Sequence, residues 1–242
     1  LNKLAPVSGN VLEPSCGTGV FLQTRPEDVS VQGVELDSRS GTVASILHPD
    51  QSVAVGSYEQ FNLWNDQEYD HVIGNAPFGE RSVETAFMDR PDITGPASLD
   101  RYFIERSMSN LKDKGTMAMM VAPGVLSNKG NREWRVELMK QGQFMGAARL
   151  PNKSFAHSGT AVNPDILMFR RYPESVRKRL EQLDEEGLKR AGFFDESWAE
   201  GTYYDDHPEH RLGEAGTGNW GRETTEGDLS ARDMDRAVQV FE

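Results

Sequence analysis

Two glycines and an acidic residue, placed directly after a short apolar run, could together bind a small ligand. Glu13 follows the apolar pair Val11–Leu12, and Gly17 and Gly19 come next, before the apolar segment Val20–Thr24. Glycine lets the backbone approach a ligand closely and adopt positive φ. The string lacks the third glycine of a dinucleotide-binding turn and the lysine of a phosphate-binding loop, so a phosphate is not the expected ligand. An acid at the end of a strand suits a cationic group instead.

Further acceptors follow the next two predicted strands. Glu35 ends the strand Val29–Leu36, where an acid can accept hydrogen bonds from both hydroxyls of a ribose. This position favours a nucleoside ligand over an ordinary tight turn with no ligand, but it does not separate one cofactor from another. Ser57 and Tyr58 follow the third strand, where an acceptor beside an aromatic ring suits an adenine. S-adenosylmethionine combines such a nucleoside with a cationic ammonium that suits Glu13.

The elements that must position these residues alternate between strands and helices through the first 172 residues. This order predicts an α/β fold with a mostly parallel sheet and helices on both faces. A loop without a helix separates the last two strands, which predicts one late antiparallel strand. The predicted strands contain Val11–Leu12, Val29–Leu36, Ser52–Val55, His71–Ile73, Thr116–Ala122, Phe144–Leu150 and Ile166–Phe169, and the predicted helices are Val20–Thr24, Ser38–Leu47, Leu99–Leu111 and Arg132–Gln141.

The chain changes character after Tyr172. Residues 1–172 carry 17 basic and 20 acidic residues, whereas residues 173–242 carry 9 basic and 18 acidic ones. A charged helix is predicted over Glu174–Lys189, and irregular structure over Gly201–Asp228. We therefore expect one domain over 1–172 and an acidic helical and irregular extension over 173–242 that links to further domains.

Composition excludes several classes of protein and site. The single cysteine rules out an internal disulfide and a four-cysteine zinc site, and the scattered histidines suggest no metal site. No run of eighteen apolar residues or signal peptide is present, so we expect a cytoplasmic protein and no membrane segment. The net charge of −12 argues against unaided, tight binding to duplex DNA, which depends on Lys and Arg at phosphates.

A tetrapeptide after the fourth predicted strand, Asn75-Ala76-Pro77-Phe78, resembles the Asn-Pro-Pro-Tyr/Phe motif of amino methyltransferases. These enzymes modify exocyclic amino groups of adenine or cytosine. With the glycine turn upstream, the motif makes residues 10–171 similar to the N6-adenine DNA methyltransferases. The resemblance implies a Rossmann-like class I methyltransferase fold with a seven-stranded sheet, and S-adenosyl-L-methionine as cofactor. Family members usually have proline where this chain has Ala76, but the contact there is a backbone carbonyl, which alanine also supplies.

The resemblance assigns roles to the motif residues. The side-chain oxygen of Asn75 and the main-chain carbonyl of Ala76 would accept the two hydrogens of the amine, so that its lone pair points at the methyl group. Pro77 stiffens the turn, and Phe78 offers a face on which a flipped base can stack. Phe155, in a late Leu-Pro segment, matches the aromatic residue that clamps the other face of the base, although an ordinary hydrophobic loop anchor fits it nearly as well.

The predicted cofactor site combines both stretches of sequence. Its expected members are Glu13, Pro14, Ser15, Gly17, Gly19, Glu35, Leu36, Ser57, Tyr58 and Asn75. The expected partner is DNA, bound through additional domains or subunits. The segment from Tyr203 to Leu229 also resembles the region after the methylase domain in large methylase–helicase proteins of phages and mobile elements.

Three other functions remain open from the sequence. Methylation of cytosine N4 uses the same acceptors, although Asn75 stands where those enzymes more often have serine. A non-catalytic binding or assembly module is a second possibility. It would explain the acidic charge and why the sequence shows no counterpart of the target-recognition domain that enzymes of the family usually carry. Methylation of a protein glutamine shares the same chemistry and would suit an acidic surface.

Overall fold

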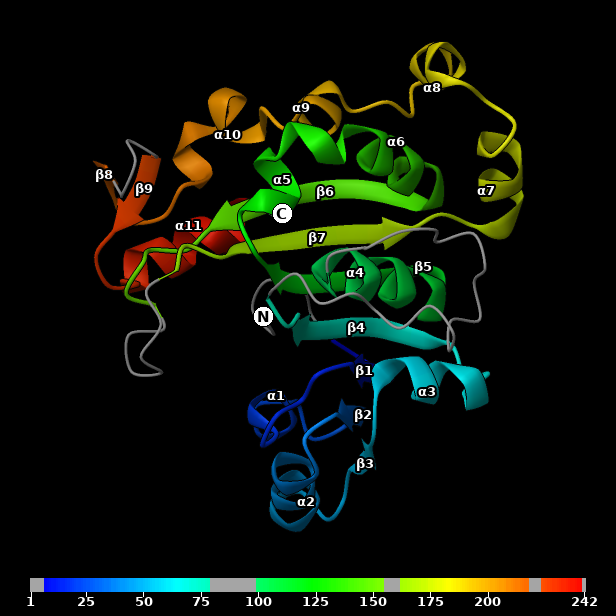
Figure 1. Cartoon of the computed structure of the whole chain (residues 1–242), viewed down its shortest axis with the longest axis vertical. Coiled ribbons are helices and arrows are strands. Elements are labelled where there is room, and N and C mark those ends of the chain that lie inside the picture. The colour runs from blue at the N-terminus through cyan, green and yellow to red at the C-terminus, as the bar shows by residue number, and fades with distance from the viewer. Residues whose placement is uncertain (1–6, 79–98, 155–161, 218–222, 241–242) are drawn as a thin grey trace. The chain divides into compact units, whose positions relative to one another are not determined.

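The computed structural model describes residues 7–78, 99–154, 162–217 and 223–240. Seven strands form one sheet in the order β3-β2-β1-β4-β5-β7-β6 (Figure 1). The strands are β1 (Asn10–Glu13), β2 (Ser30–Glu35), β3 (Ser52–Val55), β4 (Tyr69–Asn75), β5 (Leu111–Val121), β6 (Gly142–Arg149) and β7 (Asp165–Arg171). The predicted α/β class and seven-stranded sheet are confirmed.

Strand pairing follows the predicted pattern. β1 runs parallel to β2 and to β4, and β2 runs parallel to β3. β6 and β7 are antiparallel, with Ala147 opposite Leu167. Because the loop between β6 and β7 contains no predicted helix, the chain can return beside the strand that it has just left, which confirms the expected antiparallel pair.

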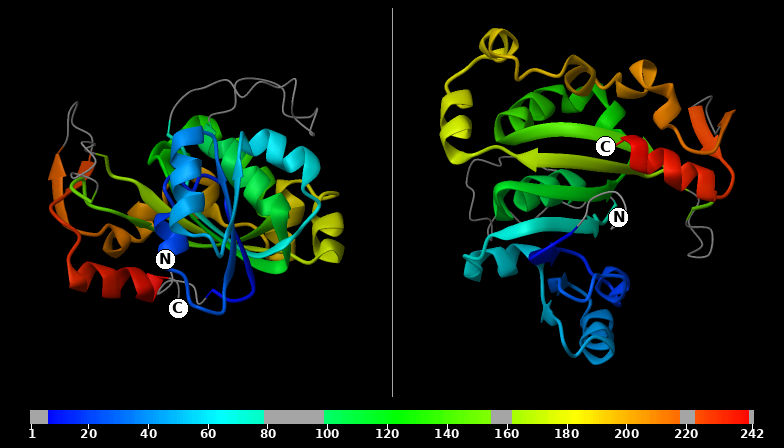
Figure 2. Two further views of the ribbon diagram at one scale, coloured as in Figure 1. Left: turned by 90° about the horizontal axis from the view of Figure 1, so that it is seen from below. Right: turned by 180° about the vertical axis from the view of Figure 1, so that it is seen from behind.

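Helices lie between the strands, and the chain forms two compact units, Leu1–Met119 and Met120–Glu242. In the first unit, α1 and α2 lie on one side of β1–β3 and α3 lies on the other (Figures 1 and 2). Up to β6, the sequence predicts α1, α2, α4 and α6 but not α3 or α5. No described helix is long and apolar enough to cross a membrane. Up to β6 the helices are α1 (Val20–Gln23), α2 (Ser38–Leu47), α3 (Tyr58–Trp64), α4 (Leu99–Asn110), α5 (Gly124–Ser127) and α6 (Arg132–Gln141), with a 3-10 turn at Lys129–Asn131.

The extension supplies part of the core of the second unit. Trp198 is fully buried, and its ring stacks on Phe144 with 4.6 Å between ring centroids. The Trp198 and Phe169 rings form a T-shaped pair with 5.1 Å between their centroids, and the indole N–H donates to the main-chain oxygen of Arg135 at 3.0 Å. The extension contains α7 (Glu174–Leu180), α8 (Glu185–Ala191), α9 (Glu196–Glu200), α10 (Tyr203–Asp206), a 3-10 turn (Pro208–His210), the hairpin β8 (Glu214–Thr217) and β9 (Glu223–Glu226), and α11 (Ala231–Val240).

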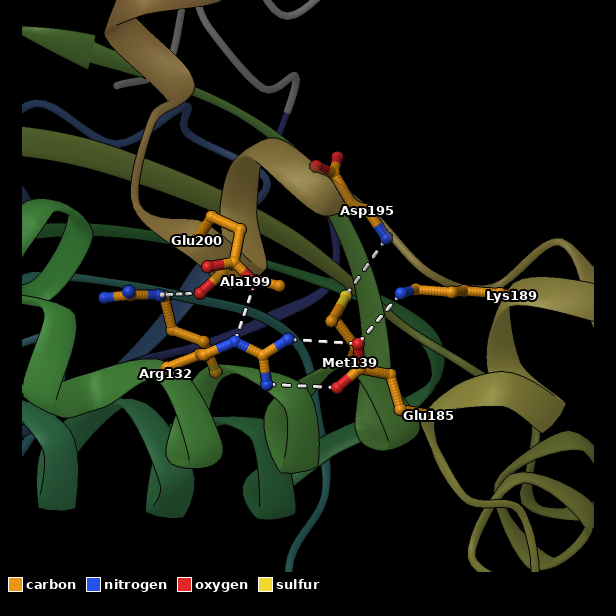
Figure 3. Close-up of polar contacts among 8 residues, drawn as sticks. Arg132, Met139, Glu185, Lys189, Asp195, Ala199 and Glu200 are labelled. Carbon is orange, nitrogen blue, oxygen red and sulfur yellow. Dashed lines mark hydrogen bonds and ion pairs between the residues drawn. The ribbon is translucent and has the colours of Figure 1, made fainter.

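Polar contacts attach α8 and α9 to α6 (Figure 3). The guanidinium of Arg132 donates two 3.0 Å hydrogen bonds to the carboxylate of Glu185 and one of 2.6 Å to Glu200. Arg135 donates to the main-chain oxygen of Ala199 at 3.1 Å, which satisfies part of a buried guanidinium. The extension therefore packs on α6, β6 and β7 within one unit.

Two details of the extension differ from the sequence-based expectation. The single helix predicted over Glu174–Lys189 is two helices, because Asp184 leaves the helical path and caps α8 by accepting from the N–H of Gly187 at 2.8 Å. The segment predicted as irregular contains α10 and the β8–β9 hairpin. The predicted boundary between a methyltransferase domain and an extension, at residues 172 and 173, stays a prediction. The two compact units of the structure meet instead between Met119 and Met120.

Candidate active site

The carboxyl ends of β1 and β4 lie beside each other. The two strands pair in parallel, with Val11 opposite His71, so Glu13 at the end of β1 neighbours the strand that ends at Asn75. The order of the sheet reverses here, because β2 pairs on one side of β1 and β4 on the other. In open α/β sheets, ligands bind outside the carboxyl ends of the strands at such a switch point.

The glycine turn after β1 has the backbone that the sequence predicts. Gly17 and Gly19 have φ values of 55° and 91°. A Cβ on Gly19 would lie 2.6 Å from Cδ2 of His48, so a side chain there would force the turn away from His48 at the end of α2. The N–H of Gly17 donates to Oε2 of Glu35 at 2.7 Å. The turn is thus fastened to the end of β2.

Glu13 is a buried carboxyl group that lacks a partner on one oxygen. Its side chain is 2% exposed, and its Oε2 makes no hydrogen bond within the described part of the chain. Burial, with a smaller contribution from the negative charge of Glu35, raises the pKa of Glu13 to about 9. A cation placed against this carboxyl would restore its charge and satisfy the oxygen. The geometry therefore fits the ammonium-binding role predicted for Glu13.

We expect Glu13→Gln to remove a pH-dependent loss of stability. The folded-state pKa of about 9 lies above the ordinary value of 4.5, so between these values the folded chain holds one proton more than the unfolded chain. The free energy of unfolding of the parental chain therefore falls as pH rises through this window, by up to about 1.4 kcal/mol per pH unit. The glutamine amide, which has the shape of the neutral acid, has no such dependence. Urea unfolding of both chains below, near and above neutral pH measures the difference; parallel pH profiles would contradict the raised pKa.

Glu35 both holds the turn and keeps the capacity to bind a ligand. Its Oε2 accepts from Gly17, and its Oε1 accepts from the N–H of Asp37 at 2.8 Å. Each carboxylate oxygen can accept a second hydrogen bond, which leaves positions for ribose hydroxyls. Leu36, the next residue, is 65% exposed and offers an apolar surface beside them. Both residues remain predicted cofactor contacts.

The motif residues lie at the end of β4. The main-chain carbonyl of Asn75 accepts a 2.6 Å hydrogen bond from the hydroxyl of Ser15 in the glycine turn. Its side-chain Oδ1 is buried and makes no hydrogen bond among the described residues. Ala76 is buried, whereas the ring of Phe78 is 39% exposed. The structure thus presents an unpaired acceptor and an exposed aromatic ring within four residues, next to the turn.

Two predicted cofactor contacts, Tyr58 and Ser57, have structural roles in and around α3. Tyr58 is 3% exposed, its hydroxyl donates to Oδ1 of Asn110 at 2.6 Å, and its ring packs 4.9 Å from that of Phe103. The ring has no free face for an adenine, which corrects the predicted stacking role. Ser57 caps α3, since its Oγ accepts from the N–H of Gln60 at 3.1 Å. Phe155 lies outside the described residues.

Phe61 is an aromatic residue that the sequence reading missed. It lies three positions after Tyr58 on α3 and lines an open, mostly apolar cavity of about 560 Å³, which Gly56 and Ser57 also line. Prediction of a helix over 58–64 would have placed Phe61 beside Ser57, because residues four apart share a helix face. Phe61 therefore supplies an aromatic side chain to this cavity near the end of β3.

A separate cluster in the extension contains His207, Glu209 and His210. One ligand-type atom from each lies within 4.8 Å of the others, a juxtaposition that the sequence did not suggest. Glu209 lies 3.4 Å from both imidazoles. Burial lowers the pKa of His210, the charge of Glu209 opposes this shift, and the positive charge of the neighbouring Arg236 adds a smaller lowering. A neighbouring arginine disfavours a divalent cation, so we assign no metal to this cluster and keep the absence of a metal as a prediction.

Known proteins resemble this chain in sequence. A family model described as N-6 DNA Methylase matches residues 1–187. Defense against restriction protein B of Escherichia phage P1 is 32% identical over 198 residues, which are 81% of this chain and 9% of the phage protein. Modification methylase CviBIII of Paramecium bursaria Chlorella virus NC1A is 30% identical over 123 residues, which are 49% of this chain and 32% of that methylase. The chain thus spans a minor part of each of these relatives.

Solved structures share the fold. The methyltransferase subunit of a type I restriction-modification system from Streptococcus thermophilus superposes with a TM-score of 0.56 at 17% identity. The match covers 81% of this chain and 54% of that subunit. This likeness shows that the two proteins share a fold.

Proposed function

This chain belongs to the N-6 DNA methylase family, and we propose that it transfers a methyl group from S-adenosyl-L-methionine to the N6 amine of adenine in DNA. One observation carries the proposal. Asn75 presents a buried Oδ1 that is unpaired among the described residues at the end of β4, and the same residue is hydrogen-bonded through its main chain to the glycine turn. The two halves of the proposed site, the glycine turn and the motif, are therefore in direct contact.

The residues of the turn suit this cofactor. Glu13 would take the amino-acid ammonium, the free lone pairs of Glu35 would take the ribose hydroxyls, and Ser57 with Phe61 would border the adenine. The bound cofactor supplies an electrophilic methyl group on its sulfonium. The chain supplies the buried carboxyl of Glu13, one oxygen of which has no hydrogen-bond partner among the described residues, a feature that is otherwise costly in a folded protein.

Asn75 and Ala76 act on the methyl acceptor. The exocyclic amine of adenine is a poor nucleophile because its lone pair is delocalised into the ring. Oδ1 of Asn75 and the carbonyl of Ala76 accept its two hydrogens, which favours a tetrahedral nitrogen and stabilises the positive charge that develops during transfer. Pro77 limits the freedom of this turn.

The base must leave the duplex to reach these acceptors. Phe78, with its exposed ring, would stack on the extruded base, a contact worth about 1–3 kcal/mol. Phe155 would meet the opposite face. Because the chain carries a net charge of −12, we assign most of the contacts to DNA phosphates to other domains or subunits.

The test uses S-adenosylmethionine with a labelled methyl group and two single-stranded oligonucleotides, one with adenine and one with cytosine as its only amino base. We expect label in the adenine strand. Label in the cytosine strand alone would overturn the adenine assignment in favour of cytosine N4. Label in protein alone would favour glutamine methylation, and cofactor binding without transfer to any acceptor would favour a binding module.

We expect Glu35→Ala to weaken binding of S-adenosylhomocysteine by roughly 10- to 150-fold. The ribose would lose charge-assisted hydrogen bonds worth about 1.5–3 kcal/mol in total. Isothermal calorimetry measures the change, with Glu27→Ala, at an exposed position outside the site, as the matched control. A dissociation constant equal to that of the parental chain would remove Glu35 from the site.

A further inference from the structure

Ser15 joins the glycine turn to the end of β4. Its hydroxyl donates a 2.6 Å hydrogen bond to the main-chain carbonyl of Asn75, which lies sixty residues later in the sequence. The peptide unit is planar, so a bond that fixes this carbonyl also fixes the N–H of Ala76 and the backbone from which both acceptors extend.

The next two residues of the turn are hydrogen-bonded to β2, the strand on the other side of β1. The N–H of Cys16 donates to the main-chain oxygen of Val34 at 2.9 Å, and that of Gly17 donates to Oε2 of Glu35 at 2.7 Å. Residues 15–17 therefore bridge the ends of β2 and β4. Any ligand that orders this turn also acts, through Ser15, on the carbonyl of Asn75.

No comparable hydrogen bond to the side-chain oxygen of Asn75 fixes the orientation of that side chain among the described residues. Oδ1 is buried without a partner in the described structure, so its direction depends on the backbone that carries it. Glu13, at the end of β1 just before the turn, also has a buried oxygen without a partner among the described residues. Each substrate of the proposed reaction thus has one unsatisfied oxygen available to it, and the Ser15 hydroxyl of the turn contacts the residue that carries one of them.

On the basis of the proposed function, we propose that Ser15 is a positioning residue that couples occupancy of the cofactor turn to the geometry of the Asn75–Ala76 peptide. Ser15 belongs to the cofactor turn, but its hydroxyl positions the peptide that binds the amine to be methylated. Loss of the hydroxyl therefore lowers the rate of transfer more than it lowers affinity for the cofactor.

Hydrogen exchange tests the coupling without DNA or turnover. In the parental chain, saturating S-adenosylhomocysteine is expected to slow exchange of the amides of Asn75 and Ala76 severalfold. Ser15→Ala should bind the same ligand within about threefold of the parental affinity and lose this protection. Ser15→Thr, which keeps a hydroxyl, should restore it. Ser45→Ala, which removes a comparable serine-to-carbonyl bond inside α2, should leave the protection unchanged.

Steady-state methylation gives the second readout. Ser15→Ala should lower kcat about tenfold with an unchanged KM for the cofactor, and Ser15→Thr should recover most of the loss. Equal kcat in the parental chain and Ser15→Ala would overturn the proposal. So would a rise in cofactor KM that accounts for the whole defect, because the hydroxyl would then act on the cofactor itself.

The two arms separate this inference from the proposed function. If the parental chain methylates cytosine or protein, the adenine assignment fails, but loss of protection in Ser15→Ala still supports the coupling. If protection at Asn75 and Ala76 is the same in both chains, or does not arise in the parental chain, the coupling is wrong whatever base is methylated.

Discussion

Replacement of Asn75 by alanine is expected to lower turnover by on the order of a hundredfold or more, with cofactor affinity close to that of the parental chain. The acceptor is needed most when the amine becomes tetrahedral and positive, and hardly at all when the cofactor alone is bound. Its buried Oδ1 makes no hydrogen bond in the described part of the chain, so its removal breaks no bond that supports the fold. Single-turnover methyl transfer and calorimetry of cofactor binding measure the two quantities separately.

Asn131→Ala is a suitable control for this substitution, because its side chain donates to the carbonyl of Gly124 far from the motif in sequence. We expect it to leave turnover at the parental value. Methylation by Asn75→Ala at the parental rate, with equal cofactor affinity, would contradict the mechanism proposed for the amine.

Trp198→Ala is expected to lower the free energy of unfolding by about 3–5 kcal/mol. The indole is fully buried, stacks on Phe144, and bonds the main chain of Arg135. Alanine would leave a cavity between α6, α9 and the β6–β7 pair, and it would leave a carbonyl without its donor. Urea unfolding followed by circular dichroism measures the loss.

Trp64 provides the matched control, because it is 87% exposed at the end of α3. Trp64→Ala should change the free energy of unfolding by less than about 0.5 kcal/mol. Equal stability of Trp198→Ala and the parental chain would show that the extension is not part of the core that the structure describes.

The sequence predicts the fold where short-range patterns determine it. Apolar runs of strand length, glycines at positive φ and the alternation of strands and helices are local signals, and the sheet follows them closely. Tyr58 shows the limit of such signals. An aromatic residue after a strand reads equally well as a ligand contact or as the start of a helix, and its bond to Asn110, fifty-two residues away, decides the outcome.

The extension shows the same limit at larger scale. Its acidic composition suggests an appendage, yet a few apolar residues, Trp198 and Leu212 among them, are fully buried. The average composition of the segment is dominated by its charged residues, so it does not reveal these few buried apolar side chains. Likewise, the sequence places Ser15 in the cofactor turn, but only the pairing of β1 with β4 brings its hydroxyl to the carbonyl of Asn75.

The most direct measurement of the central claim is the identity of the nucleoside that receives the methyl group. Duplex DNA is incubated with the chain, together with any partner domains that it needs, and labelled S-adenosylmethionine; the DNA is then digested and its nucleosides are separated by mass spectrometry. The account predicts labelled N6-methyladenine with the parental chain and a loss of about a hundredfold in its rate of formation with Asn75→Ala. Label confined to another nucleoside or to protein, or equal rates with the two chains, would contradict it.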